Sequence, residues 1–295
     1  MNRFFFLLVI IVAFFSCEEV VELDYRQEQK ICLNGVLNPD SLVRLSLHYT
    51  RPLDANDDFI PIDDAQILLY EDGQEWNTVS SLGNGTYGID QYPQIGKTYR
   101  VKVNIGGNLP LSAETIVPER PDIDFTIKSK EKYAGWSEYS EVTQFYVLEV
   151  DYRINDRTGK DYYWNYHLGW YVPGEKYNFS ASLAYFSPYA DNFNREIDAE
   201  TKLGFYYHFY MRQTDDGLDG HVLEFNKQMS TRSVDVFFNA DEHYDRYIKS
   251  SVQSWLIEEW EVLPFKEPVQ IYSNIENGTG IFGSASFTYI SYRDE

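Results

Sequence analysis

The strongest constraint on the fold is the way apolar residues alternate with polar ones over short stretches that end in turn residues. Residues 42–47, 65–70 and 98–103 all alternate in this way. A period of two is typical of a half-buried strand, because successive side chains point to opposite faces of a sheet. The dipeptide Asn84-Gly85 is a strong signal for a hairpin turn between two such strands. Short strands at a spacing of roughly 8–12 residues therefore predict an all-β protein with sandwich architecture.

A proline-rich segment near residue 120 is the best candidate for a domain boundary. Pro118 and Pro121 end the last strand of the first part and stiffen the connection. We therefore predict a β-sandwich domain over residues 18–119 and a larger, antiparallel, aromatic-rich β domain over residues 120–295. Helical periodicity is confined to one short stretch near residues 241–260, where Asn239 or Asp241 can cap the first turn.

Residues 1–17 have the pattern of an export signal. Arg3 precedes an unbroken apolar run of 12 residues, 4–15, which is too short to span a bilayer. The run ends at Ser16-Cys17, which resembles a lipobox, although Phe14 stands where leucine is usual. The competing interpretation is a buried helix or strand, which the abrupt change to Glu18-Glu19 disfavours. We predict a lipoprotein signal peptide over residues 1–17, with Cys17 carrying acyl chains, palmitate among them, that anchor the protein.

The net charge limits the partners of the chain. Against 25 Lys and Arg stand 46 Asp and Glu, a formal net charge of -21. Such a surface repels nucleic acid and anionic lipid headgroups, so we expect no nucleic-acid partner and contact with the membrane only through the lipid anchor. Neutral glycans, peptides, cations and other proteins remain possible partners. The two cysteines rule out a disulfide framework, and we expect Cys32 to be a small buried core residue.

The C-terminal segment is the most specific part of the chain. Residues 267–283 read EPVQIYSNIENGTGIFG and resemble the C-terminal signature of a Bacteroidota lipoprotein family known only as domain of unknown function 4249. Residues 33–40, 70–73 and 96–101 are similar, in order, to further segments of that family. The resemblance implies an outer-membrane lipoprotein, often encoded beside a TonB-dependent receptor and without an established activity. The pair Glu18-Glu19 resembles the signal that sends such lipoproteins to the cell surface.

A second resemblance concerns the fold of the first domain. Asp64, Asp72-Gly73, Gly85 and the run Gly96-Lys97-Thr98-Tyr99 occur in an order similar to that of small sandwich modules related to carboxypeptidase regulatory domains. The resemblance implies an immunoglobulin-like sandwich in which these residues are scaffold and carry no chemistry. The glycines of the C-terminal signature are likewise interpreted as turn and packing positions. A phosphate cradle would need the lysine and following helix that this segment lacks.

Two aromatic strands of the second domain are the candidate ligand-binding surface. In residues 162–171 one face carries Tyr163 and Tyr171, and in residues 203–212 the more polar face carries Tyr206 and Tyr210. If both faces belong to one sheet, their rings form a platform for a neutral glycan or for a protein partner. The competing interpretation is that large sheets bury such rings and leave the hydroxyls at the rim.

Catalytic and metal signals are weak. Asp215 and Asp219 lie in an acidic, glycine-containing loop that is a weak Ca²⁺ candidate, and an acidic hairpin turn explains the loop as well. No zinc-ligand spacing or nucleophile motif is present, and we predict no cofactor. These weak signals favour a non-catalytic protein, and the family resemblance implies an accessory or binding subunit of a TonB-dependent uptake system. A stand-alone glycan- or peptide-binding module is the first alternative, and a hydrolase is the second.

Overall fold

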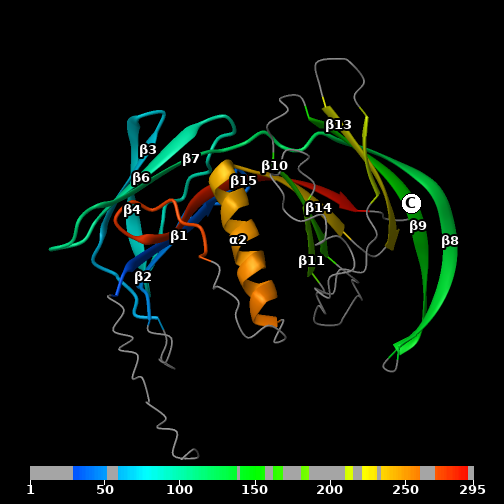
Figure 1. The fold of residues 1–295 in the computed structure, drawn as a ribbon, viewed down its shortest axis with the longest axis horizontal. Coiled ribbons are helices and arrows are strands. Elements are labelled where there is room, and N and C mark those ends of the chain that lie inside the picture. Colours follow the sequence, from blue (N-terminus) through cyan, green and yellow to red (C-terminus); the bar gives the residue numbers. More distant parts are fainter. Residues whose placement is uncertain are drawn as a thin grey trace, which may run out of the picture.

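The computed structural model describes residues 29–51, 59–137, 140–156, 162–168, 181–185, 210–214, 221–230, 234–259 and 270–291 (Figure 1). Strands dominate these ranges, which confirms the all-β prediction. The elements are β1 Ile31–Leu37, β2 Arg44–Tyr49, β3 Gln66–Glu71, β4 Gln74–Gly83, β5 Thr86–Gly88, β6 Thr98–Asn104, β7 Leu111–Ile116, β8 Ile123–Ser137, β9 Ser140–Asp156, β10 Tyr162–Leu168, β11 Ala181–Tyr185, β12 Tyr210–Thr214, β13 His221–Ser230, β14 Val234–Ala240, α2 Glu242–Glu259 and β15 Thr279–Ser291.

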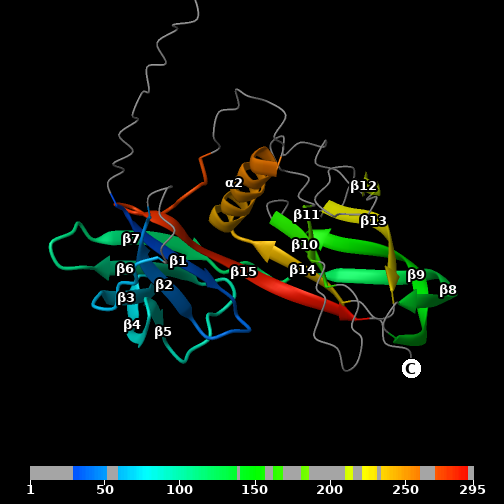
Figure 2. The ribbon, with the colours of Figure 1, turned by 90° about the horizontal axis from the view of Figure 1, so that it is seen from below.

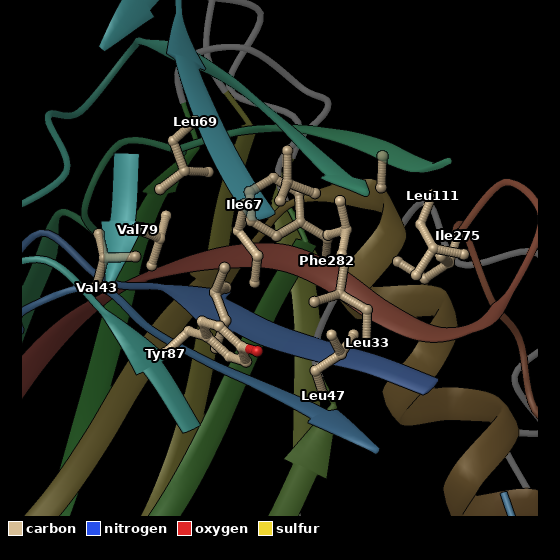
Figure 3. Close-up of a cluster of buried hydrophobic side chains, with 14 of the residues drawn as sticks. Leu33, Val43, Leu47, Ile67, Leu69, Val79, Tyr87, Leu111, Ile275 and Phe282 are labelled. Atoms are coloured by element: carbon tan, nitrogen blue, oxygen red, sulfur yellow. The ribbon is translucent and has the colours of Figure 1, made fainter. Parts of the chain in front are cut away.

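The first sandwich is built by strands β1 to β7 together with the start of β15. Alternate residues of β1, β2, β3, β6 and β7 point inward, as the sequence period predicts, and together with Val79 of β4 and Tyr87 of β5 they form one hydrophobic core. Figure 3 shows side chains from both layers of this core in contact, with Phe282 of β15 and Ile275 from the preceding segment among them. Cys32 is only half-buried, contrary to our expectation, because the inward positions of β1 are the odd-numbered ones from Ile31 to Leu37.

The predicted turn at Asn84-Gly85 and a second turn at Asp72-Gly73 have the backbone that their residues favour. Asn84 and Gly85 have φ of 53° and 69°, and Asp72 and Gly73 have φ of 48° and 82°. Positive φ at both central residues is what a two-residue hairpin turn of matching twist requires. Asp72 also accepts a hydrogen bond from the Thr98 N–H at 3.1 Å and pairs with Lys97 at 2.6 Å. The segments 70–73 and 96–101, far apart in the sequence, therefore meet at one corner of the sandwich.

Strand β15 belongs to two sandwiches at once. Its first half pairs in parallel with β1, from Cys32 opposite Thr279 to Leu37 opposite Ser284. Its second half pairs with β14 in antiparallel fashion. Eleven of the described strands therefore form one sheet in the order β11-β10-β14-β15-β1-β2-β5-β4-β3-β6-β7, which runs through both parts of the molecule (Figure 2).

A separate sheet, in the order β12-β13-β9-β8, forms the other layer of the second sandwich. The buried Tyr152 of β9 connects this layer to β14. Its hydroxyl donates to Asp235 at 2.6 Å, and its ring lies 5.2 Å from the ring of Phe237. Because Asp235 and Phe237 of β14 are both buried, this contact is part of the core of the second sandwich.

The link near residue 120 lies along β15. Alternate hydroxyls of the strand donate to carbonyl oxygens of the link. Ser284 reaches Ile116 at 2.7 Å, Ser286 reaches Pro118 at 2.6 Å and Thr288 reaches Pro121 at 2.9 Å. A domain division at this position stays a prediction, but the end of the chain fastens the two parts to each other across it.

A pair of charged side chains holds the link at a second point. Arg120 donates to Asp40 through both terminal nitrogens, at 2.5 and 2.7 Å, and to the Phe287 carbonyl at 2.9 Å. The hydrogen bond from Arg120 holds the pKa of Asp40 below its ordinary value. A carboxyl with a lowered pKa in the folded state stabilises the fold above its unfolded pKa, and this contribution is lost as the pH falls through the folded pKa.

We therefore expect Asp40→Asn to lower the free energy of unfolding near neutral pH and to have a smaller effect as the pH falls below the ordinary carboxyl pKa. The loss is at most about 1 kcal/mol, because both side chains are roughly two-fifths exposed and the pair is screened by water. Urea unfolding of the wild type and the variant at about pH 7 and about pH 3 measures this difference, since the ordinary carboxyl pKa is about 4. A difference that is the same at both pH values would contradict the assignment. Arg120→Gln, which also removes the bond to the Phe287 carbonyl, should cost at least as much as Asp40→Asn near neutral pH.

Candidate functional site

The helix α2 covers the point where β15 passes from one sandwich to the other. It begins directly after Asp241 and occupies Glu242–Glu259, which confirms the helix predicted near residues 241–260. Tyr244 and Ile248 pack on a small cluster that contains Phe238 and Ala285. Gly283 permits this close approach, since a Cβ there would lie 2.8 Å from the Cβ of Tyr244.

Asp241 is the N-cap of α2, and its carboxylate also connects the helix to β15 and β7. Its Oδ1 accepts from the Tyr244 N–H at 2.9 Å and from the Ser284 N–H at 3.0 Å, and its Oδ2 accepts from the Thr115 hydroxyl at 2.9 Å. Burial raises the pKa of this carboxyl, and the three hydrogen bonds oppose the rise. The sequence indicated Asp241 as a possible helix cap. It did not indicate the hydrogen bonds from Ser284 and Thr115, because these residues are distant in sequence.

One flank of α2 holds the segment that leads to β15. The Tyr272 hydroxyl lies 2.7 Å from His243 Nδ1, and the Arg246 guanidinium lies 4.1 Å from the centroid of the same ring. The Tyr272 N–H donates to Ser250 Oγ at 2.8 Å. Burial raises the pKa of Tyr272, while Arg246 lowers it. These contacts place residues 270–274 against the helix.

The C-terminal signature is used as scaffold. Asn274 forms two bonds with Phe282, accepting from its N–H at 3.0 Å and donating to its carbonyl at 2.8 Å. Asn277 donates to the Pro110 carbonyl at 2.9 Å, which ties the signature to the turn before β7. Gly280 has φ of 106° and allows β15 to lie directly against the Leu33 carbonyl. The polar and glycine residues of this segment thus shape the backbone, in agreement with their structural interpretation.

An open groove of about 390 Å³ lies between α2 and the outer face of the first sandwich. Tyr244 and Tyr247 form the helix wall, and burial raises the pKa of Tyr244. The floor consists of residues of β1, β2, β5 and β15, among them the buried Gly35 and Leu45, and its residue types are mixed polar and apolar. The lining residues are Asn34, Gly35, Val36, Arg44, Leu45, Ser46, Thr86, Tyr244, Tyr247 and Ile281.

The charge in the groove is already paired. Arg44 donates to the Val43 carbonyl at 2.8 Å and to the Ile89 carbonyl at 2.9 Å, and it forms an ion pair with Asp90 at 3.2 Å. The hydroxyls of Ser46 and Thr86 and the two tyrosines present uncharged hydrogen-bonding groups beside apolar carbon. This combination suits a neutral ligand that offers both hydroxyl or amide groups and apolar faces.

Two of the four tyrosines that were predicted to form one platform lie in described strands, and these strands belong to different sheets. Tyr163 lies in β10, opposite Asn239, and Tyr210 lies in β12, opposite Asn226. Because β10 and β12 belong to different sheets, these two residues do not share a sheet face. Tyr171, Tyr206, Asp215, Asp219 and Cys17 lie outside the described residues.

The groove was not predicted from the sequence. Its clearest local signal is the pair Tyr244 and Tyr247, which are three residues apart and therefore share a flank of a helix. That signal does not reveal that the helix wall faces β1, β2 and β5. Within the described ranges, no group of three or more His, Cys, Asp or Glu side chains is arranged to hold a metal ion. The same ranges contain no helix that is both long and apolar enough to cross a membrane.

Fold and groove together define an all-β protein in which two sandwiches share one sheet and a single helix covers the junction. A family model described as Domain of unknown function (DUF4249) matches residues 18–291. The chain belongs to this family, which confirms the resemblance seen in its C-terminal signature. No curated protein matches the chain.

Proposed function

We propose that this protein is a non-catalytic, surface-exposed outer-membrane lipoprotein of the Bacteroidota, and that it is an accessory or binding subunit of a TonB-dependent uptake system. Residues 1–17 support the anchor, because they combine a basic start, a short apolar run and Ser16-Cys17. The groove between α2 and the first sandwich is the observation that carries the binding role. It is open to solvent, and the fold holds both of its walls rigidly through Asp241 and the β1–β15 pair.

The ligand class proposed for the groove is a neutral glycan or a peptide. A chain with a net charge of -21 does not attract anionic ligands over long range, and Arg44 in the groove is paired with Asp90. Tyrosine rings and hydroxyls are the groups that contact sugars and peptide backbones at low entropic cost. The same groove supports the second candidate, a module that binds such a ligand without a receptor. Tyr163, Tyr171, Tyr206 and Tyr210 stay candidates for a further contact surface.

Two variants test the anchor and the groove separately. Cys17→Ala should abolish labelling by a palmitate analogue and move the protein out of the membrane fraction. Tyr247→Ala should leave the protein in the membrane and weaken capture of its receptor or glycan. Truncating one central ring in a desolvated contact costs on the order of 2 kcal/mol, roughly thirtyfold in affinity.

The matched control for the groove is Tyr92→Ala, which removes an exposed ring from a loop that does not line the groove. Equal capture by wild type, Tyr247→Ala and Tyr92→Ala would contradict a binding role for the groove. Unchanged palmitate labelling of Cys17→Ala would contradict the anchor. Turnover of a glycan or peptide by the purified protein, lost on changing Asp215 and Asp219, would favour the hydrolase alternative.

A further inference from the structure

Exposed apolar side chains gather at one end of the first sandwich. Phe59, Ile60, Leu82 and Leu109 are 52%, 54%, 56% and 72% exposed, and they are among the ten large hydrophobic residues that stand out as exposed in the described ranges. Each lies in a turn, a strand end or a connecting segment and not in the middle of a sheet. Exposed apolar residues that share one part of a surface indicate contact with a membrane or a partner.

Strand register places these residues at the end where the described chain begins. Ile31, the first residue of β1, lies opposite Tyr49 of β2. The Tyr49 N–H donates to the Ile60 carbonyl at 2.9 Å, and the Thr50 N–H donates to the Lys30 carbonyl at 2.8 Å. The segment with Phe59 and Ile60 is thus a direct neighbour of the chain that enters β1.

Two further turns complete this end of the sandwich. Leu82 precedes the β4–β5 turn, where the Gly85 carbonyl accepts from the Leu47 N–H at 2.7 Å. Leu109 belongs to the β6–β7 turn, and its neighbour Pro110 accepts the bond from Asn277, two residues before β15 begins opposite Cys32. Figure 2 shows the start of β1 and the β6–β7 turn at the end of the elongated molecule that is farthest from β8 and β9.

The apolar end combines an uncharged turn with charged side chains of both signs. The β6–β7 turn, residues 105–110, contains no charged residue in a chain that is 24% charged. Lys30 is exposed beside it, and Arg51 lies 5.0 Å from the ring centroid of Phe59. Asp63, which follows Ile60 in this segment, accepts the Gly85 N–H at 2.6 Å. The opposite end carries three ion pairs, Asp72 with Lys97, Asp40 with Arg120 and Asp90 with Arg44.

We propose that, in addition to the lipid anchor expected from the sequence, this apolar end, Phe59, Ile60, Leu82 and Leu109 together with Lys30, docks on the interface of the lipid bilayer. The proposal rests on the proposed lipidation of Cys17. Eleven residues, 18–28, separate that cysteine from the described chain and reach at most about 40 Å when extended. The anchor therefore keeps this end within about 40 Å of the membrane.

Lipid is the occupant that position and apolar character favour. Phenylalanine and leucine side chains partition into the headgroup and acyl boundary, while a lysine beside them extends to the headgroups. The net charge of -21 makes a zwitterionic surface the expected target and an anionic one unfavourable. Docking by this end directs the long axis of the molecule away from the membrane, with β8 and β9 farthest from it.

The test uses the full-length lipidated protein in vesicles of phosphatidylcholine and phosphatidylethanolamine. An environment-sensitive fluorophore is attached at Ile60→Cys, at Leu109→Cys or at Tyr92→Cys, each in a Cys32→Ser background. Tyr92 is the matched control, because it is 57% exposed but lies between β5 and β6 at the opposite end. We expect doxyl-labelled lipids to quench the fluorophore at positions 60 and 109, with a blue shift of its emission, and to leave position 92 unquenched.

The outcomes separate docking from anchoring. Protein that floats with the vesicles but shows no more quenching at positions 60 and 109 than at position 92 overturns the docked end and leaves the anchor intact. Equal, strong quenching at all three positions also overturns it, since the body would then lie flat. Protein that carries no palmitate label and does not float overturns the anchor, and the docking proposal with it. Leu109→Glu should abolish quenching at position 60 without reducing flotation.

Discussion

Replacing Gly280 by alanine is expected to destabilise the protein by about 4 kcal/mol, as the sum of backbone strain and a forced displacement of β1. Gly280 has φ of 106°, a conformation that residues with a Cβ rarely adopt. A Cβ there would press on the Leu33 carbonyl and lie 2.8 Å from Asn34 Oδ1. Both groups belong to β1, so the two central strands of the shared sheet would have to separate. Urea unfolding followed by tryptophan fluorescence measures the loss.

Gly107→Ala is the matched control for this substitution. Gly107 also has positive φ, at 80°, but a Cβ there would meet no atom within 4 Å. The control therefore isolates the strain of the backbone, about 1 kcal/mol, from the contact with β1. Equal losses in the two variants would show that the close approach of β15 to β1 does not contribute.

Asp241→Ala is expected to cost a similar amount, about 4 kcal/mol, because it leaves several buried donors without an acceptor. The Tyr244 N–H, the Ser284 N–H and the Thr115 hydroxyl all donate to this one carboxyl. The loss of an N-cap alone costs about 1 kcal/mol, so a larger effect would measure the bonds to β15 and β7. We expect α2 to detach from the junction and the groove to lose its helix wall, which thermal unfolding and ligand capture would both report.

Asp241→Asn distinguishes the geometry of the side chain from its charge. The amide oxygen can still accept from Tyr244 and Ser284, and burial already raises the pKa of the carboxyl. We therefore expect the asparagine variant to recover most of the stability, with a remaining loss of about 1 kcal/mol. Glu242→Ala, next in sequence and exposed, should have little effect. An asparagine variant as unstable as the alanine variant would show that a negative charge is required at this position.

The predicted tyrosine platform shows which structural features cannot be inferred from strand patterns. Alternation within residues 162–171 and 203–212 is local, and it correctly indicated a strand that contains Tyr163 and another that contains Tyr210. Whether two strands share a sheet depends on pairing between distant segments, and nothing within either strand specifies it. In the structure β10 pairs with β14 and β12 pairs with β13. The local prediction was thus sufficient for the strands and insufficient for a common surface.

The sequence by itself determined the features that depend on neighbours along the chain. Period-two alternation defined the strands of the first sandwich, Asn84-Gly85 defined a turn and the stretch after Asp241 defined the helix, because side-chain direction and φ preference act within a few residues. Only the tertiary structure decided that β15 lies beside β1, that its hydroxyls hold the link at Pro118 and Pro121, and that α2 faces a groove. These contacts join residues up to about 250 positions apart, for example Ile281 and Asn34, and they form only when burial of both sandwich cores offsets the entropy of closing so long a loop.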